Sequence, residues 1–102
     1  MAAMQTFLVL SKAGPLRDLS KDSRAQIYWD EHAEFIDKLD GEGFILLGGP
    51  LVDEGGALLV VHATGEQEIR EKLQADPWYV NGVLTMDGIK RWDIFIDHWM
   101  KA

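Results

Sequence analysis

The chain contains no cysteine, so it has neither a disulfide framework, a thiolate metal site nor a cysteine nucleophile. Basic residues are also scarce, because ten lysines and arginines stand against seventeen acidic residues and give a formal net charge of -7. A surface of this charge repels phosphate backbones and anionic lipid headgroups. We therefore expect no nucleic-acid partner and no membrane partner.

Long apolar runs are missing as well. No apolar stretch approaches the roughly 18 residues of a membrane span, and residues 1–5 lack the basic and apolar segments of a secretory signal. These absences predict a soluble, cytoplasmic protein. What is present is enough for one core: we expect a single domain over residues 1–102, with 47% hydrophobic residues including four Trp and four Phe.

The apolar pattern changes period along the chain. Short apolar runs predict strands, whereas apolar residues at steps of three and four between Ala25 and Leu39 predict an amphipathic helix. The expected elements, in chain order, are a strand at 4–11, a helix at 23–40, strands at 44–47 and 57–61, a helix at 64–75 and a strand at 89–99.

The second helix has local start and stop signals. Thr64 has capping-box spacing to Gln67, and Pro77 disfavours helical geometry at Asp76, so this helix should end near Ala75. Asp76 is then expected to cap a short helical turn that begins with Pro77.

This order predicts an α+β fold of the ferredoxin-like βαββαβ type, with two helices on one face of a four-stranded antiparallel sheet. The runs at 7–10, 44–47 and 58–61 are almost continuously apolar, whereas a solvated face shows alternation. Both faces of the sheet should therefore be covered. A second copy of the same sheet is the simplest cover, so we expect a homodimer.

His32 is the most informative single residue, because it lies on the apolar stripe of the first helix between Tyr28 and Phe35. One interpretation is a general base or acid, and the other is a structural histidine bonded to a backbone carbonyl. Asp76 also has two interpretations, helix capping or orientation of His32, and a carboxylate has enough acceptor sites for both.

Other candidates have less support. Gly48-Gly49-Pro50 leaves room for a ligand close to the backbone, or only turns the chain. His62 and His98 lack the spacing of a helical ligand pair, so we expect no metal and no cofactor. The large aromatic residues either line a pocket or belong to the core or a dimer interface: Trp78, Tyr79, Trp92 and Trp99.

Taken in their order and spacing, these features resemble the YCII-related (YciI-like) family of the dimeric α+β barrel superfamily. The resemblance covers nearly the whole chain. It is carried by the apolar first strand, the helix with His32, Gly43-Phe44 before Gly48-Gly49-Pro50, Gly55-Gly56, Asp76-Pro77-Trp78 before Gly82-Val83, and Ile89 with Trp92 in the last strand.

The resemblance implies a ferredoxin-like protomer, a dimer whose sheets form a barrel, and an active-site cleft with a His and Asp pair. Those catalytic roles fall on His32 and Asp76. We expect the substrate to be bound by Gly49, Pro50, Trp78 and Tyr28. The family is similar in fold to muconolactone isomerase, and some relatives act in aromatic degradation, one type as a dehydrochlorinase. This chain departs from the family at Trp78, where Tyr or Phe is common.

The sequence leaves two main functions open, and a weaker third is a haem-degrading monooxygenase on the same superfamily fold, for which His62 and His98 would be the candidate ligands. The first is a cofactor-independent lyase or isomerase in which His32, oriented by Asp76, moves a proton on a small cyclic or aromatic metabolite. The second is a non-catalytic domain that binds a small ligand or a partner chain, in which both residues are structural.

Overall fold

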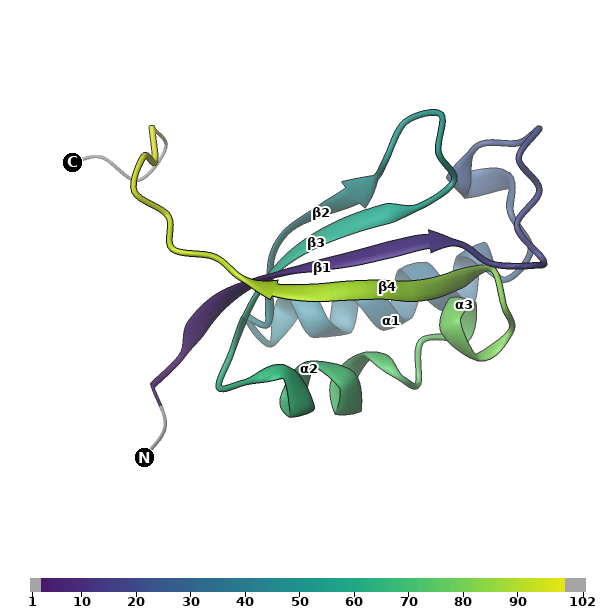
Figure 1. Cartoon of the computed structure of the whole chain (residues 1–102). Helices are drawn as coiled ribbons and strands as arrows, with labels where there is room; N and C mark the ends of the chain where they lie inside the picture. The colour runs from purple at the N-terminus through teal and green to yellow at the C-terminus, as the bar shows by residue number, and fades with distance from the viewer. Residues whose placement is uncertain (1–2, 99–102) are drawn as a thin grey trace.

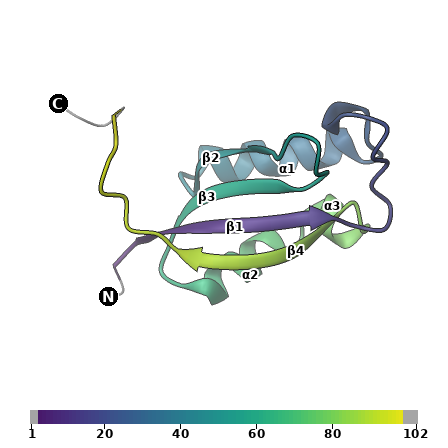
Figure 2. The ribbon, with the colours of Figure 1, turned by 45° about the horizontal axis from the view of Figure 1, so that its top comes forward.

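The sheet of this protein has the strand order β2-β3-β1-β4, with every neighbouring pair antiparallel. The computed structural model describes residues 3–98. Figures 1 and 2 show helices on one side of the sheet, so the predicted ferredoxin-like α+β fold is confirmed. The elements are β1 (Gln5–Ala13), η1 (Ser23–Ala25), α1 (Trp29–Gly41), β2 (Ile45–Pro50), β3 (Ala57–Ala63), α2 (Glu66–Leu73), α3 (Pro77–Val80) and β4 (Leu84–Arg91).

The first helix begins later than predicted. A continuous helix from residue 23 is wrong, because Tyr28 has a left-handed backbone with φ of 65° that interrupts helical geometry. The residues before it form only the 3₁₀ turn η1, which Asp22 caps by accepting a hydrogen bond from the backbone of Ala25. Helix α1 then starts at Trp29, and its last turn is followed by Gly43 with φ of +79°.

The start of α2 also differs in detail. The backbone N–H of Thr64 donates to Glu68 Oε1 at 2.7 Å, so the predicted capping box with Gln67 is wrong by one residue. The helix ends at Leu73, two residues earlier than expected. The predicted cap of the next turn is confirmed, since the Asp76 carboxylate accepts from the backbone N–H of Trp78 at 2.9 Å.

The last strand is displaced along the chain. A strand at 89–99 is wrong: β4 ends at Arg91, and residues 92–98 form neither helix nor strand. Their alternating apolar pattern does exist, and at its start the backbone N–H of Trp92 still donates to the carbonyl of Thr6 on β1. Trp99 lies outside the described residues. No helix among residues 3–98 is long and apolar enough to cross a bilayer.

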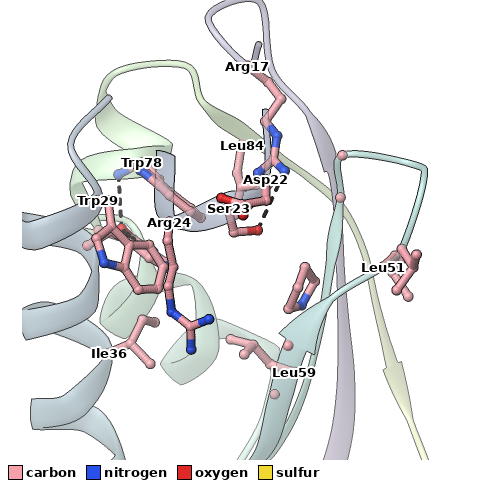
Figure 3. Close-up of a pocket in the computed structure, with 18 of the residues that line it drawn as sticks. Arg17, Asp22, Ser23, Arg24, Trp29, Ile36, Leu51, Leu59, Trp78 and Leu84 are labelled. Atoms are coloured by element: carbon pink, nitrogen blue, oxygen red, sulfur yellow. Dashed lines mark hydrogen bonds and ion pairs between the residues drawn. The ribbon is translucent and has the colours of Figure 1, made fainter. Parts of the chain in front are cut away.

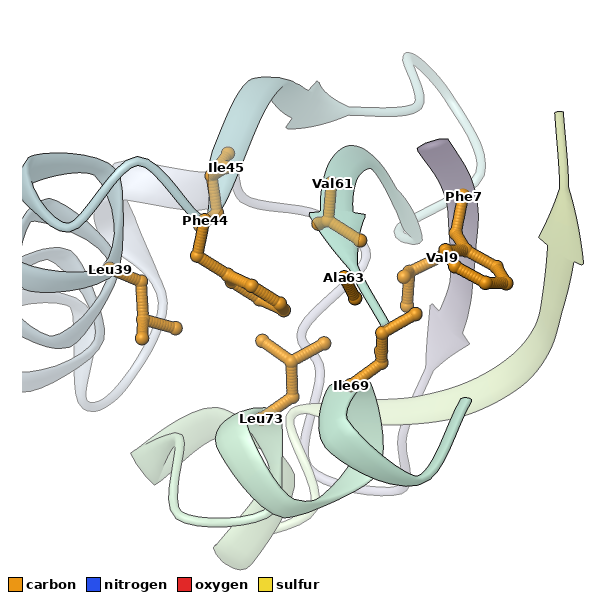
Figure 4. Close-up of a cluster of buried hydrophobic side chains, with 9 residues drawn as sticks. All are labelled: Phe7, Val9, Leu39, Phe44, Ile45, Val61, Ala63, Ile69 and Leu73. Atoms are coloured by element: carbon orange, nitrogen blue, oxygen red, sulfur yellow. The ribbon is translucent and has the colours of Figure 1, made fainter. Parts of the chain in front are cut away.

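The core fills the space between the sheet and helices α1 and α2. Figure 4 shows side chains of both layers meeting there. Phe7 and Val9 of β1 share the inner face of the sheet with Val61 and Ala63 of β3. The buried cluster is Phe7, Val9, Leu39, Phe44, Ile45, Val61, Ala63, Ile69 and Leu73.

The outer face of the sheet is apolar too. Residues alternate between faces along a strand, so Leu8 and Leu10 point away from the core and pair across β3 with Val60 and Leu58. The helices lie on the other side and leave this face uncovered (Figure 2). Leu47 on the edge strand β2 is 67% exposed. The structure thus retains the uncovered apolar face from which the sequence predicted a second copy.

Candidate active site

Asp76 is a buried carboxylate placed by a local turn. It lies between α2 and α3, where Pro77 begins the short helix, and its carboxylate is directed back over the first turn. Only 1% of the residue is exposed. A buried carboxylate needs donors, and Asp76 has two: the backbone N–H of Trp78 and the imidazole of His32.

His32 approaches Asp76 from α1, 44 residues away in the sequence. Its Nδ1 lies 2.8 Å from Oδ1 and 3.0 Å from Oδ2 of Asp76. A carboxylate accepts, so Nδ1 carries the proton and donates, and Nε2 has the free lone pair of the neutral ring. Nε2 has no hydrogen-bond partner among residues 3–98. The geometry is that of a base whose tautomer is fixed by a carboxylate.

Aromatic rings hold the imidazole in place. The ring of His32 stacks on Trp78 with centroids 3.7 Å apart and planes 7° apart. Trp29 packs against both, with centroid distances of 5.9 Å to His32 and 5.7 Å to Trp78. The indole Nε1–H of Trp78 donates to the carbonyl of Ile27 at 2.9 Å. Stacking and bonding together leave His32 little freedom to rotate.

A cavity of about 820 Å³ opens beside this cluster. Figure 3 shows Trp29, Trp78 and Ile36 on one side of it, with Leu51 and Leu59 on the other. The sequence-predicted residues that line it are His32, Asp76, Gly49, Pro50 and Trp78.

Tyr28 is the one predicted substrate-binding residue that does not line this cavity. It stands at the left-handed position before α1. Its carbonyl accepts from the N–H of His32 at 3.0 Å, so Tyr28 contributes to the site through its backbone.

Arg17 lines the cavity and was missed by the sequence analysis. Its guanidinium carbon lies 6.0 Å from the ring centroid of Trp78, and its Nη2 lies 3.5 Å from Ser23 Oγ. Its Nε is buried and has no hydrogen-bond partner among residues 3–98. Buried donors are normally satisfied, so this one fits an acceptor oxygen of a ligand. No local sequence signal marks Arg17, because its role depends on a wall formed by distant residues.

Gln26 holds the loop between Arg17 and Arg24 in place. It is 5% exposed, and its side-chain amide makes four hydrogen bonds to the preceding loop, one of them from Nε2 to the carbonyl of Asp22 at 3.2 Å. Nε2 donates to the carbonyls of Asp18 at 2.7 Å and Lys21 at 3.0 Å, and Oε1 accepts from the N–H of Asp18 at 2.8 Å. The loop fixed in this way connects Arg17 to Arg24, and Arg24 lies with its guanidinium carbon 5.9 Å from the Trp29 ring.

Tyr79 and Ser11 add a second polar pair next to the site. Tyr79 lines the cavity, and its hydroxyl is hydrogen-bonded to the buried hydroxyl of Ser11 on β1. Burial raises the pKa of the Tyr79 phenol, and the nearby carboxylate of Asp76 acts in the same direction. Tyr79 is therefore a neutral hydroxyl at physiological pH.

The remaining candidates lie elsewhere. His62 alternates with Val61 on β3 and so faces the outer side of the sheet, away from His32. His98 and Trp92 belong to the segment beyond β4, where Trp92 is 41% exposed. None of these three side chains lines the cavity.

No family model matches this chain, and no curated protein matches it in sequence. Among solved structures the chain is similar to 5-chloro-2-hydroxyhydroquinone dehydrochlorinase (TftG) from Burkholderia phenoliruptrix AC1100, in complex with 2,5-dihydroxybenzoquinone. The match covers 86% of this chain and 93% of that chain, with 22% identity and a TM-score of 0.60. The two proteins share a fold.

Proposed function

We propose that this chain is a cofactor-independent enzyme of the lyase or isomerase type, acting on a small cyclic or aromatic metabolite. One observation carries the proposal: His32, which lines the cavity, is held through Nδ1 by a buried carboxylate, while Nε2 has no protein partner among residues 3–98. In this role His32 is the general base, and Asp76 orients it and stabilises the imidazolium that forms.

The proposed chemistry balances without a redox partner. Nε2 of His32 removes a proton from a hydroxyl or an acidic carbon of the ring, and the released electron pair moves into the ring. In an isomerisation the proton returns at another carbon. In an elimination an anionic leaving group departs from a tetrahedral ring carbon with its bonding pair, and the proton stays on His32 until solvent takes it.

Arg17 supports a substrate that develops an oxyanion. Its guanidinium lines the same cavity as His32, and its buried Nε is a donor without a partner among residues 3–98. A hydroxyl deprotonated by His32 leaves negative charge on oxygen, which a preorganised cation stabilises. The indole of Trp78 beside it is already stacked on the imidazole of His32, and this aromatic pair forms part of the cavity wall.

The solved structure of similar fold agrees with this substrate class. That protein is a dehydrochlorinase of a chlorinated hydroxyhydroquinone and was solved with a dihydroxybenzoquinone. We accordingly propose hydroxylated aromatic compounds as the first substrates to try, and membership of the YCII-related family. We also propose a cytoplasmic location and a homodimer whose sheets pack through the outer apolar face that contains Leu8, Leu10 and Leu58.

A non-catalytic ligand-binding domain is the second candidate, and one observation favours it. Asp76 caps α3 through the Trp78 backbone, so its burial has a structural explanation that needs no chemistry. The two candidates differ in outcome. A binding domain returns the ligand unchanged, whereas the enzyme converts it.

The test is a turnover assay on chlorinated hydroquinones and lactones, in which substrate loss is monitored by absorbance and the products are identified. We expect His32→Ala to lower turnover of an identified substrate by about 10²–10⁴-fold. His62→Ala, a histidine on the outer face of the sheet, is the matched control and should retain full activity. Unchanged turnover in His32→Ala would sink the proposal, and binding without conversion would favour the second candidate.

A further inference from the structure

A pair of hydroxyls beside the cavity has no part in the reaction proposed above. Ser11 alternates with Val9 on β1, so its side chain points to the inner face of the sheet, where the residue is 5% exposed. Helix α3 lies against the sheet near the end of β1 (Figures 1 and 2), and the hydroxyl of its Tyr79 is hydrogen-bonded to that of Ser11. The pair therefore joins α3 to the sheet.

This pair has one hydrogen more than its own bond uses. Each hydroxyl carries one hydrogen, and one of the two forms the bond between Ser11 Oγ and Tyr79 Oη. Neither hydroxyl has another hydrogen-bond partner among residues 3–98. A donor that is largely buried and has no acceptor is unfavourable, so the second hydrogen marks a place for an acceptor atom from outside the chain.

The hydrogen of Tyr79 is the one that a ligand can reach. Tyr79 lines the cavity of about 820 Å³, whereas Ser11 does not, so Ser11 donates to the phenol oxygen and the phenol hydrogen is left for the cavity. Gly56 of the cavity wall lies on the backbone of Ser11, since a Cβ added to Gly56 would be 2.2 Å from the Ser11 carbonyl oxygen. The charge of Asp76 acts on the phenol. The hydroxyl thus lies close to the carboxylate that holds His32.

A second, smaller cavity is also lined by Tyr79, and it suits this donor less well. Its volume is about 280 Å³, and its other lining residues are Arg70, Gln74 and Met86. The side chain of Arg70 is 60% exposed and lies 3.9 Å from Glu66, so this cavity is open to water. Among the residues that the structure describes, its lining contains neither a histidine nor a carboxylate. A substrate oxygen is therefore expected in the larger cavity.

The charges of the larger cavity decide which kind of oxygen Tyr79 binds. Burial raises the pKa of the Tyr79 phenol, which stays protonated and donates. Arg17 has a fixed charge in the same cavity and suits the oxygen that becomes negative. Within residues 3–98, five carboxylates and three cations line this cavity, so a second ionised oxygen is disfavoured there: Asp22, Asp37, Asp40, Asp53 and Asp76, with Arg17, Lys21 and Arg24. The second oxygen is accordingly a hydroxyl or a carbonyl.

We propose that Tyr79, held in place by Ser11, donates a hydrogen bond to a second, uncharged oxygen of the substrate and so selects rings with two oxygen substituents over rings with one. The inference rests on the proposed function and deepens it, because it names the substituents that the substrate carries. Tyr79 is then a specificity-determining residue and Ser11 a positioning residue. No proton leaves Tyr79 in this role.

Binding of simple phenols tests the inference without turnover. The probes are phenol and its dihydroxy derivatives catechol, resorcinol and hydroquinone, each titrated into ¹⁵N-labelled protein. We expect the best dihydroxy compound to bind the wild type about three- to tenfold more tightly than phenol, the gain of one net hydrogen bond. Tyr79→Phe should bind phenol as the wild type does and lose this preference. Ser11→Ala should reduce the preference, and Thr85→Val, which removes an exposed hydroxyl outside the cavity, should keep it.

Several outcomes would overturn the inference. They are equal affinities of the wild type for phenol and its derivatives, no measurable binding of any of them, and a preference that survives Tyr79→Phe. The wild type alone also reports the place of binding. Signals of His32 and Trp78 should shift, whereas a shift of Met86 without them would place the ring in the smaller cavity and contradict the inference. If the preference is found but no chlorinated hydroquinone is converted, only the proposed function fails.

Discussion

Replacing Asp76 with Asn removes one charge from the centre of the site and keeps the shape of the side chain. The amide oxygen of Asn can still accept from the Trp78 N–H that lies 2.9 Å from Oδ1, so the cap of α3 should persist. What is lost is the ionic part of the bond from His32, whose Nδ1 lies 2.8 Å and 3.0 Å from the two carboxylate oxygens.

The size of this loss follows from burial and charge. Hydrogen bonds to charged groups contribute about 1.5–3 kcal/mol, against about 0.5–1.5 kcal/mol for neutral pairs. The side chains of His32 and Asp76 are 14% and 2% exposed, so solvent screens the pair little. We expect a coupling energy between Asp76→Asn and His32→Ala of roughly 1–3 kcal/mol.

The assay is urea unfolding of the wild type, both single variants and the double variant at neutral pH. A parallel cycle of Asp76→Asn with His62→Ala is the control, because His62 faces the outer side of the sheet. That cycle should be additive to within about 0.3–0.5 kcal/mol. If the His32 cycle is additive to the same degree, the bond contributes no net stability and the reasoning from burial fails.

Three further predictions concern stability. Leu73 is fully buried under the sheet, so Leu73→Ala should lower the free energy of unfolding in urea by about 2–5 kcal/mol. A smaller loss would mean that the surrounding core relaxes into the space left by the side chain. The hydrogen bond from the backbone N–H of Thr64 is the main cause that lowers the pKa of Glu68. The ionised Glu68 carboxylate therefore stabilises the fold above the unfolded pKa of about 4.3, and this contribution is lost as the pH falls through the folded value. Glu68→Gln should reduce the fall of the urea unfolding midpoint between neutral and acidic pH. A fall as large as that of the wild type would contradict this prediction. Burial raises the pKa of Tyr79, so the neutral phenol stabilises the fold below about pH 10, and this contribution is lost as the pH rises through the folded value. Tyr79→Phe should remove that alkaline loss and, by leaving the Ser11 hydroxyl without its partner, cost about 1 kcal/mol at neutral pH; an alkaline limb identical to wild type refutes the assignment.

The order of strands and helices was predictable because it is written in local periodicity. The apolar steps up to Leu39, the run at 58–61 and the Asp76-Pro77 pair each act over a few residues, and all three gave elements that the structure contains. Boundaries were less predictable. The left-handed backbone of Tyr28 ends the preceding turn and delays α1, and no residue type at this position announces it.

The amino-acid sequence by itself determined the class of fold and the uncovered apolar face, and it singled out His32 and Asp76 separately, since apolar period, proline geometry and an out-of-place histidine are local properties; their pairing was implied only by the family resemblance. Only the tertiary structure brought Nδ1 of His32 to 2.8 Å from Asp76 across 44 residues. It also placed Arg17 beside Trp78 and sent Phe95 out into solvent. These facts depend on how the helices pack against the sheet and on where the pairing of β4 with β1 ends, and no local pattern encodes either.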